Sequence, residues 1–338
     1  MRIQEHVPLA PRTSLELGGP ARFFVEATDD TMVAEALAWA ARRGVPARVL
    51  GGGSNLVVAD AGFDGLVIEM AQRDLQIDGN RVRAAAGEPW DVLVARCVDA
   101  GLAGLECLSG IPGRVGATPI QNVGAYGQEV AETIRAVRAL DRATGHEQLL
   151  TPAQCAFGYR DSMFKRDPDR FVVLEVTFEL VAGGAPALRY AELARAFEGD
   201  ASPSLSEVRE KVIALRRTKS MVIDASDPNR RSAGSFFTNP IVAPEVADAV
   251  VAASEAPVPR WPTEDGRVKL AAGWLIEQAG MSKGTRRGAV GISSAHALGL
   301  VHHGGGTTAQ LLALADEVRD AVRARFGVTL EREPVLWA

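Results

Sequence analysis

The segment from residue 21 to residue 52 alternates between the two hydrophobic periods that distinguish strands from helices. ARFFVEA (21–27) and ARVLGG (47–52) are rich in β-branched or aromatic residues. Between them, MVAEALAWAARRG repeats apolar positions at helical spacing and ends on Gly44. A strand, a helix and a strand in this order predict a β-α-β unit and a fold of the α/β (α+β) class.

The same patterns predict further elements along the chain. Ser204 and Glu207 form a capping box, and Thr307 or Thr308 and Gly327 are the expected N-cap and C-cap of a long helix. Strands are expected at 65–70, 81–87, 133–141, 171–180 and 288–293, and helices at 89–101, 204–219, 242–254, 270–279 and 307–327. At 338 residues the chain exceeds one ordinary core. The polar stretch 220–234 reads as a linker, with a domain boundary near residue 218.

Composition excludes several classes of protein. A net charge of -5 argues against broad contact with nucleic acid or anionic membrane, which would require a basic face. The first residues lack the apolar core of a signal peptide, and nowhere do eighteen apolar residues run together, so a cytoplasmic protein is expected, by default a monomer. Three cysteines without a C-x-x-C pair indicate reduced, buried thiols. The histidines show no metal-ligand spacing, and the pair His302-His303 before a triple glycine suggests a turn.

Two glycine-rich loops lie in the first half of the chain. LGGGSNLVV (50–58) follows a strand but has neither the G-K-[ST] of a P-loop nor a G-x-G-x-x-G pattern. SGIPGRVGATPIQNVGAYG (109–127) is almost uncharged and belongs to a glycine-rich segment, 104–128, that is too long for a simple connection. Successive backbone N–H groups in such loops can bind phosphate oxygens. Together the loops predict a dinucleotide held mainly by backbone.

These loops, in this order and spacing, resemble the UDP-N-acetylenolpyruvoylglucosamine reductase (UDP-N-acetylmuramate dehydrogenase, MurB) family. The resemblance covers essentially the whole chain. It continues through GYRDSMFK (158–165), LRYAEL (188–193), RRTK (216–219), GSFFTNP (234–240), AAGWLIEQAG (271–280) and LEREP (330–334). It implies a two-subdomain FAD-binding unit of the vanillyl-alcohol-oxidase/PCMH type and a C-terminal α+β substrate-binding domain. The implied bounds are 1–70 and 71–217 for the two FAD-binding subdomains, 218–327 for the substrate-binding domain, and 328–338 for a C-terminal strand and tail.

The family's activity belongs to peptidoglycan synthesis. The resemblance implies that NADPH gives a hydride to FAD, and that the reduced flavin then reduces the enolpyruvyl ether of UDP-N-acetylglucosamine enolpyruvate to UDP-N-acetylmuramate. The residues implied to bind FAD are Gly51, Gly52, Gly53, Ser54, Asn55, Ser109, Gly110, Pro112, Gly113, Gly116, Ala117, Gln121, Asn122, Gly124, Ala125 and Tyr126. No metal is implied.

Three residues are implied to be catalytic. Hydride addition to CH2=C(OR)–COO⁻ pushes charge onto the carboxylate, and this requires a nearby cation and a proton donor over the adjacent carbon. Arg160 would clamp the carboxylate, Glu333 would help stabilise the enediolate, and Ser235 would deliver the proton. A serine acting as an acid needs no histidine base, and there is none within fifty residues of Ser235. Spacing alone does not separate Glu333 from Glu331, because both would point to one face of a strand.

Tyr190, Lys219 and Asn239 are implied to bind substrate. Tyr190 and Lys219 would contact its diphosphate, and that of NADPH in turn, and Asn239 the uridine diphosphate portion. Tyr190 indicates the family's longer form, in which a loop carrying this tyrosine closes over the substrate. Three residues depart from the family's usual pattern: Arg114, Thr238 and Pro334. Arg114 either points outward or touches the FAD phosphates.

Several other interpretations remain. Ser235 could be a turn or cap residue, Arg160 could form a surface ion pair with Asp161, and Lys219 could simply cap the negative end of a helix. A flavin oxidase of the same fold would need neither the serine acid nor the terminal glutamate. A non-catalytic flavin- or nucleotide-binding module is the alternative from another class. A serine hydrolase is disfavoured because no base is available.

Overall fold

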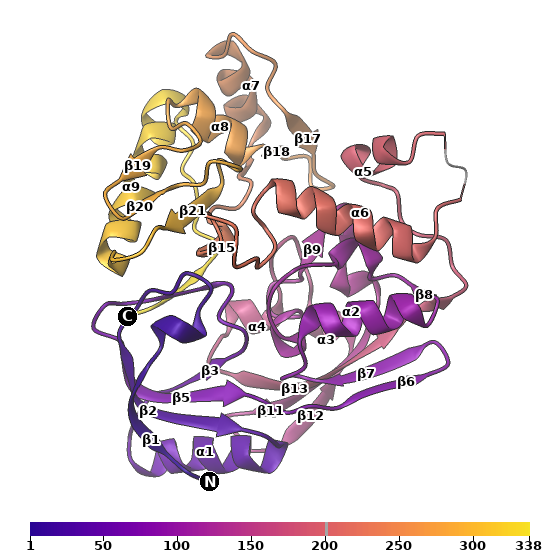
Figure 1. The fold of residues 1–338 in the computed structure, drawn as a ribbon, viewed down its shortest axis with the longest axis vertical. Helices are drawn as coiled ribbons and strands as arrows, with labels where there is room; N and C mark the ends of the chain where they lie inside the picture. The colour runs from indigo at the N-terminus through magenta and orange to yellow at the C-terminus, as the bar shows by residue number, and fades with distance from the viewer. Residues whose placement is uncertain (200–201) are drawn as a thin grey trace. The chain divides into compact units, whose positions relative to one another are not determined.

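The computed structural model describes residues 1–199 and 202–338 (Figure 1). The chain forms two compact units. Unit 1 comprises Met1–Val7, Ala21–Gly52 and Asp64–Val222, and unit 2 comprises Pro8–Pro20, Gly53–Phe63 and Ile223–Ala338. The chain passes from unit 1 to unit 2 for the last time after Val222, near the domain boundary expected at residue 218. Two early segments of the chain, Pro8–Pro20 and Gly53–Phe63, belong to unit 2.

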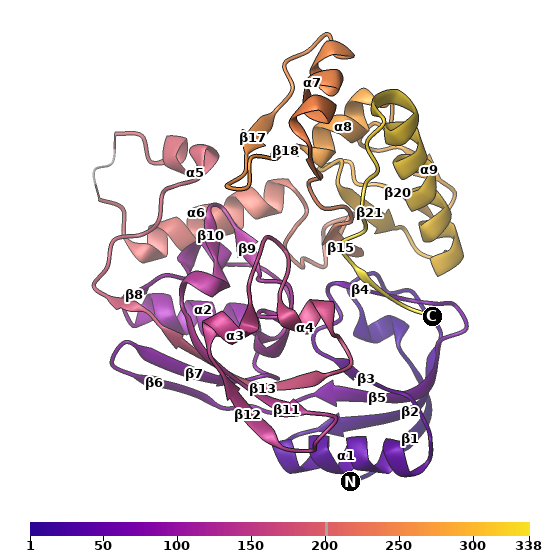
Figure 2. The same ribbon diagram turned by 180° about the vertical axis from the view of Figure 1, so that it is seen from behind.

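The first sheet of unit 1 has the order β1-β2-β5-β3. Its strands are β1 (Gln4–Pro8), β2 (Pro20–Ala27), β3 (Ala47–Leu50) and β5 (Phe63–Met70). The helix α1 (Asp30–Arg42) joins β2 to β3 and lies against one face of the sheet (Figures 1 and 2). β3 pairs with β5 in parallel. The predicted β-α-β order is therefore present, with β5 inserted between its two strands.

The second sheet of unit 1 is antiparallel, in the order β12-β11-β13-β7-β6. Its strands are β6 (Leu75–Asp78), β7 (Arg81–Ala85), β11 (Ile134–Asp141), β12 (Glu147–Leu150) and β13 (Phe171–Glu179). A single apolar core joins this sheet to the first one and to α2 (Trp90–Asp99), and Trp90 packs against Phe178 with 5.9 Å between ring centroids. Short helices follow: α3 (Pro152–Cys155), α4 (Met163–Arg166), α5 (Ala191–Ala196) and the longer α6 (Leu205–Thr218).

The glycine-rich segment of unit 1 forms only short elements. These are β8 (Leu102–Ala103), which pairs with β14 (Val181–Ala182), η2 (Glu106–Leu108), η3 (Val115–Ala117), β9 (Gly124–Ala125), β10 (Gln128–Glu129) and η4 (Val130–Glu132). Several of its residues have backbone angles that side chains rarely adopt, among them Asn122 and Tyr126 at φ +45° and +49°. The segment is therefore an ordered loop, as its length and composition predict.

Unit 2 is built on a four-stranded sheet in the order β15-β21-β20-β19. Its strands are β15 (Ser232–Ser235), β19 (Arg286–Arg287), β20 (Val290–Ile292) and β21 (Gly299–His302). α8 (Ala272–Gln278) and α9 (Thr308–Phe326) pack on it through a second apolar core. The other elements are β4 (Leu56–Val58), β16 (Ile241–Val242), α7 (Pro244–Ala252), β17 (Arg260–Pro262), β18 (Val268–Leu270) and β22 (Val335–Trp337), which pairs with β4 in parallel.

Local sequence patterns located the helix ends well. The capping box of Ser204 and Glu207 is present, as are the N-cap Thr307 and the left-handed C-cap Gly327. One local expectation is wrong: His302 lies at the end of β21 rather than in a turn, and its ring nitrogens contact the Leu15 carbonyl and the Gly306 N–H. Burial in the sheet overrides the turn preference of the glycines that follow.

Candidate active site

The two glycine-rich loops meet in unit 1. A Cβ on Gly52 would lie 2.6 Å from the Cα of Gly113, which is closer than side chains approach backbone. A Cβ on Gly51 would make ordinary contacts with Ala117 and with the stem of Arg114, at 3.7 and 3.8 Å. The backbones can approach this closely only because glycine occupies both sides. This contact supports the prediction from the sequence that the two loops belong to one site.

The residues around these loops suit an anionic ligand. Gly110 and Gly113 have φ of +71° and +131°, angles found where backbone N–H groups converge. Arg216 is buried, and its Nε is within 3.5 Å of the Cβ position of Gly110 but has no hydrogen-bond partner. Burial, followed by the nearby charge of Arg73, holds the pKa of Arg114 below its ordinary value. Two partly or fully buried cations beside a glycine loop fit the diphosphate of a dinucleotide such as FAD.

Asp91 holds the start of the second loop. Its carboxylate accepts the N–H of Gly110 at 2.6 Å and a bidentate pair from Arg209 of α6 at 2.7 and 2.8 Å. Burial acts to raise the pKa of Asp91, but these hydrogen bonds outweigh it and leave the pKa below its ordinary value. The loop is thereby fastened to both α2 and α6.

Two predicted cofactor residues have their side chains engaged with the protein. Asn122 is buried and donates to Glu129 and to the Gly158 carbonyl, at 2.7 and 3.0 Å. Ser109 is also buried and donates to the Glu106 carbonyl at 2.6 Å. Any contact of these two residues with a cofactor would come from the backbone. Their side chains shape the loop instead.

Arg160 lies in a tight turn in unit 1. Gly158 and Asp161 form the paired ends of this turn, and Arg160 has φ +52°. Its guanidinium donates to the Gly124 carbonyl at 2.6 Å, while Asp161 forms an ion pair with Arg166. Arg160 therefore contacts the second glycine loop, and the ion-pair partner of Asp161 is Arg166.

Ser235 and Glu333 lie on neighbouring backbone segments of unit 2. Ser235 ends β15, where Gly234 has φ +73°, and it is followed by Phe236 and Phe237, which are both 1% exposed. The N–H of Glu333 donates to the Phe236 carbonyl at 3.0 Å.

This register separates the two candidate glutamates. Phe237 forms a bridge with Arg332, and the N–H of Thr238 donates to the Glu331 carbonyl at 3.1 Å. Glu333 therefore lies opposite Phe236, next to Ser235, whereas Glu331 lies opposite Thr238 and further along the strand. Asn55 binds the other edge of the segment that carries Glu333. Its side chain donates to the Glu333 carbonyl, and its own carbonyl accepts the N–H of Val335.

The three predicted substrate residues fall in both units. In unit 1, Lys219 pairs with Glu192 at 2.5 Å and stands over the ring of Tyr126, which packs edge-on against Tyr190. Burial raises the pKa of Tyr126 to about 12. In unit 2, Asn239 accepts the N–H of Ala272 at 2.9 Å and so caps α8. Tyr190 and Lys219 are thus brought together.

The remaining predicted cofactor residues divide between the units. Gly53, Ser54 and Asn55 belong to unit 2, and Gly53 requires glycine because its Cβ would lie 2.1 Å from the Arg12 carbonyl oxygen. The others lie along the unit 1 loop: Pro112, Gly116, Ala117, Gln121, Gly124 and Ala125.

The sequence did not predict the structural roles of three residues near the site. Arg216 stands in the RRTK motif beside Lys219, but nothing in the motif reveals that it is buried. Glu106 and Glu192 likewise lacked any local pattern. Only the fold identifies these residues, because their partners are distant in sequence.

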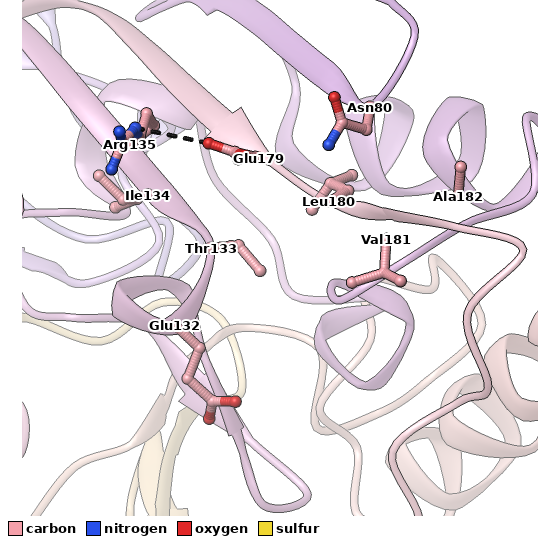
Figure 3. A pocket seen from close by; sticks show the side chains of 9 residues that line it. All are labelled: Asn80, Glu132, Thr133, Ile134, Arg135, Glu179, Leu180, Val181 and Ala182. Atoms are coloured by element: carbon pink, nitrogen blue, oxygen red, sulfur yellow. Dashed lines mark ion pairs between the residues drawn. The ribbon is translucent and has the colours of Figure 1, made fainter.

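A separate pocket lies at the end of the second sheet of unit 1. It has a volume of about 590 Å³, and Thr133, Arg135, Glu179 and Val181 are among its lining residues (Figure 3). It contains none of the predicted site residues. Over residues 1–199 and 202–338 there is no cluster of three side chains that could hold a metal ion. Within that same part of the chain, no helix is both long and apolar enough to cross a membrane.

Comparison with known proteins agrees with this geometry. A family model of an FAD binding domain matches residues 21–150, and one of the UDP-N-acetylenolpyruvoylglucosamine reductase C-terminal domain matches residues 227–337. The chain is 53% identical to the UDP-N-acetylenolpyruvoylglucosamine reductase of Thermobifida fusca, over 98% of this chain and 97% of the relative. It is 51% identical to that of Streptomyces coelicolor, over 97% and 88%.

A solved structure extends the likeness to the whole fold. The crystal structure of the reductase from Thermus caldophilus aligns with a TM-score of 0.72 and 27% identity, and the alignment covers all of both chains. The predicted fold class, an FAD-binding unit with a C-terminal domain of this family, is confirmed. The predicted cofactor, FAD, is confirmed as well. The chain belongs to the UDP-N-acetylenolpyruvoylglucosamine reductase family and is an FAD-dependent oxidoreductase.

Proposed function

We propose that the chain reduces UDP-N-acetylglucosamine enolpyruvate to UDP-N-acetylmuramate for peptidoglycan synthesis, with NADPH as the source of the hydride. The observation that carries this proposal is the register that pairs the backbone of Glu333 with Phe236, the residue after Ser235, in unit 2. Bound FAD supplies the hydride chemistry, which no side chain can provide.

Ser235 delivers the proton. Addition of hydride to the terminal carbon of CH2=C(OR)–COO⁻ leaves an enediolate, and protonation of the adjacent carbon gives CH3–CH(OR)–COO⁻. The buried rings of Phe236 and Phe237 follow Ser235 directly and make the surroundings of this half-buried serine apolar. Once substrate covers the serine, such surroundings limit the water that competes with its hydroxyl as the proton donor.

Arg160 and Glu333 stabilise the charge that develops on the carboxylate. The guanidinium of Arg160 is preorganised by its bond to the Gly124 carbonyl, and this leaves further N–H groups that can bind carboxylate oxygens. The backbone of Glu333 is hydrogen-bonded on two sides, to Phe236 and to Asn55, so its main chain is held in place. Arg160 and the protonated carboxyl group of Glu333 act on the additional negative charge that hydride transfer places on the substrate carboxylate.

Tyr190, Lys219 and Asn239 bind the nucleotide part of the substrate. Lys219 supplies the positive charge that binds the diphosphate. Tyr190 lies near Lys219, because both side chains contact the ring of Tyr126. The diphosphate of NADPH uses the same contacts in turn. The proposal includes the domain bounds 1–70, 71–217, 218–327 and 328–338, and a monomer acting in the cytoplasm without nucleic acid or membrane.

Two half-reactions test the role of Ser235. Ser235→Ala is expected to leave the anaerobic bleaching of flavin by NADPH nearly intact, and to slow the recovery of flavin absorbance on addition of the enolpyruvyl substrate by about 10²- to 10⁴-fold. The control is Ser282→Ala, an exposed serine of the same unit, which is expected to change neither step. Equal losses in both half-reactions would show that Ser235 is structural.

The wild-type protein distinguishes the rival functions in the same apparatus. Recovery of the oxidised spectrum with formation of the lactyl ether supports the reductase. Flavin that stays reduced until air enters indicates an oxidase with another substrate. A protein that binds FAD but is not reduced by NADPH points to the binding module.

A further inference from the structure

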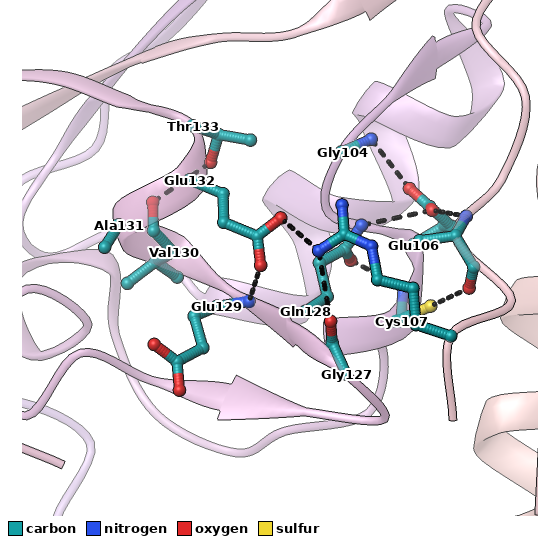
Figure 4. Close-up of polar contacts among 12 residues, drawn as sticks. Gly104, Glu106, Cys107, Gly127, Gln128, Glu129, Val130, Ala131, Glu132 and Thr133 are labelled. Atoms are coloured by element: carbon teal, nitrogen blue, oxygen red, sulfur yellow. Dashed lines mark hydrogen bonds and ion pairs between the residues drawn. The ribbon is translucent and has the colours of Figure 1, made fainter. Parts of the chain in front are cut away.

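The segment that carries Tyr190 is firmly attached at its start. The carboxylate of Glu106 is 1% exposed and accepts three N–H groups: Ala187 at 2.8 Å, Gly104 at 2.7 Å and Gln128 at 3.1 Å (Figure 4). The Cys107 thiol donates to the Ala187 carbonyl at 3.1 Å. Because breaking these bonds would strand a buried carboxylate, Ala187 is a fixed point of the segment.

Further on, the segment is held by the fully buried side chain of Leu193, which packs on α6, and by two ion pairs. Arg189 pairs with Glu132 at 2.8 Å, with side chains that are 63% and 38% exposed. Glu192, on α5, pairs with Lys219 at 2.5 Å, with side chains that are 35% and 28% exposed. Ion pairs in contact with solvent contribute little to stability and are weakened by salt. These two ion pairs can therefore open while Ala187 and Leu193 stay in place.

The position of Lys219 shows what Glu192 does. Its ammonium lies between the Glu192 carboxylate and the ring of Tyr126, 5.6 Å from the ring centroid. The ring of Tyr126 also packs edge-on against Tyr190, with 5.4 Å between centroids. Lys219 therefore lies beside both the Glu192 carboxylate and the ring pair of Tyr126 and Tyr190.

We propose that Glu192 is a positioning residue that occupies the place of the ligand's diphosphate on Lys219 and is exchanged for it on binding. This inference rests on the proposed role of Lys219. A carboxylate and a phosphate oxygen offer the ammonium the same contact, and the two cannot take it together. The diphosphate carries more negative charge and so displaces the carboxylate, whose side chain turns away while Leu193 keeps α5 packed on α6. Glu192 thereby lowers the affinity for the nucleotide.

The test is the binding of UDP to the FAD-loaded protein by isothermal titration calorimetry. Glu192→Gln keeps the size of the side chain and removes its charge. It is expected to tighten UDP binding by about two- to fivefold, the range of a partly exposed ion pair. Glu198→Gln, an exposed carboxylate of the same region, serves as the control and is expected to match the wild type. Glu192→Ala is expected to behave as Glu192→Gln does.

A double-mutant cycle with Lys219→Met gives the decisive comparison. If Glu192 acts by competing for Lys219, its replacement has no effect on UDP affinity once the lysine is gone. UDP binding that is unchanged or weaker in Glu192→Gln, with wild-type binding intact, would overturn the exchange. If Lys219→Met alone left UDP affinity unchanged, the proposed role of the lysine would fail, and the inference with it. A wild type that binds no UDP would instead refute the proposed function.

Discussion

Replacing Gly52 by alanine tests whether the contact between the two glycine loops holds FAD. The new Cβ would lie 2.6 Å from the Cα and 3.1 Å from the carbonyl carbon of Gly113, where 3.4 to 4 Å is ordinary contact. One loop must therefore move by about 1 Å, and overpacking of this kind costs about 1 to 3 kcal/mol. If that strain falls on the FAD-bound arrangement, the dissociation constant of FAD rises about 5- to 150-fold.

The assay for this variant separates binding from folding. Apoprotein is titrated with FAD and followed by flavin fluorescence, while thermal unfolding without FAD reports the strain that falls on the protein alone. Gly273→Ala is the control, because its Cβ would make an ordinary 3.5 Å contact with Leu298. Gly52→Ala that binds FAD as the wild type does, with unchanged unfolding, would refute the argument that these loops form the FAD site.

Three further outcomes are expected. Asp91→Asn should lower the free energy of unfolding by about 1–2 kcal/mol near neutral pH, through the weakened bonds to Arg209. Because the folded-state pKa of Asp91 is below its ordinary value, this stability is present above the ordinary carboxyl pKa and lost as pH falls through the folded one. Urea titrations of variant and wild type should therefore converge in acid, and a constant gap would contradict this reasoning. Gly327→Ala should cost about 1 kcal/mol by thermal denaturation, since φ is +69°; an unchanged melting temperature would argue against strain at this cap. Burial raises the pKa of Cys97 and Cys107 to about 12, so mass spectrometry should find neither alkylated by iodoacetamide in the native protein, and rapid alkylation would show that they are accessible.

Features that depend on neighbouring residues could be read from the sequence. The capping box of Ser204 and Glu207 and the C-cap at Gly327 involve groups within one turn of each other, so the local pattern contains all of the necessary information. The long glycine segment was recognisable for the same reason. Resemblance to the family added the candidate residues.

Features that depend on distant pairing could not be read in this way. Glu331 and Glu333 are equivalent in a local pattern, and only the pairing of Arg332 with Phe237 separates them. Likewise, Leu15 and Val57 are buried in the core of unit 2, with partners more than 170 residues away such as Phe236. No periodicity within residues 8–20 or 53–63 indicates which unit will bury them.

The pairing of the last strand with β4 has a consequence for the order in which the protein is made. β22 completes the two-stranded sheet with Leu56–Val58, so this part of unit 2 stays open until the ribosome has synthesised Val335–Trp337. Until then, the edge of β4 that β22 will cover presents unpaired N–H and C=O groups. Nascent chains halted before Val335 are therefore expected to expose a strand edge that chaperones or proteases can recognise, although nearly every residue named above has already been incorporated.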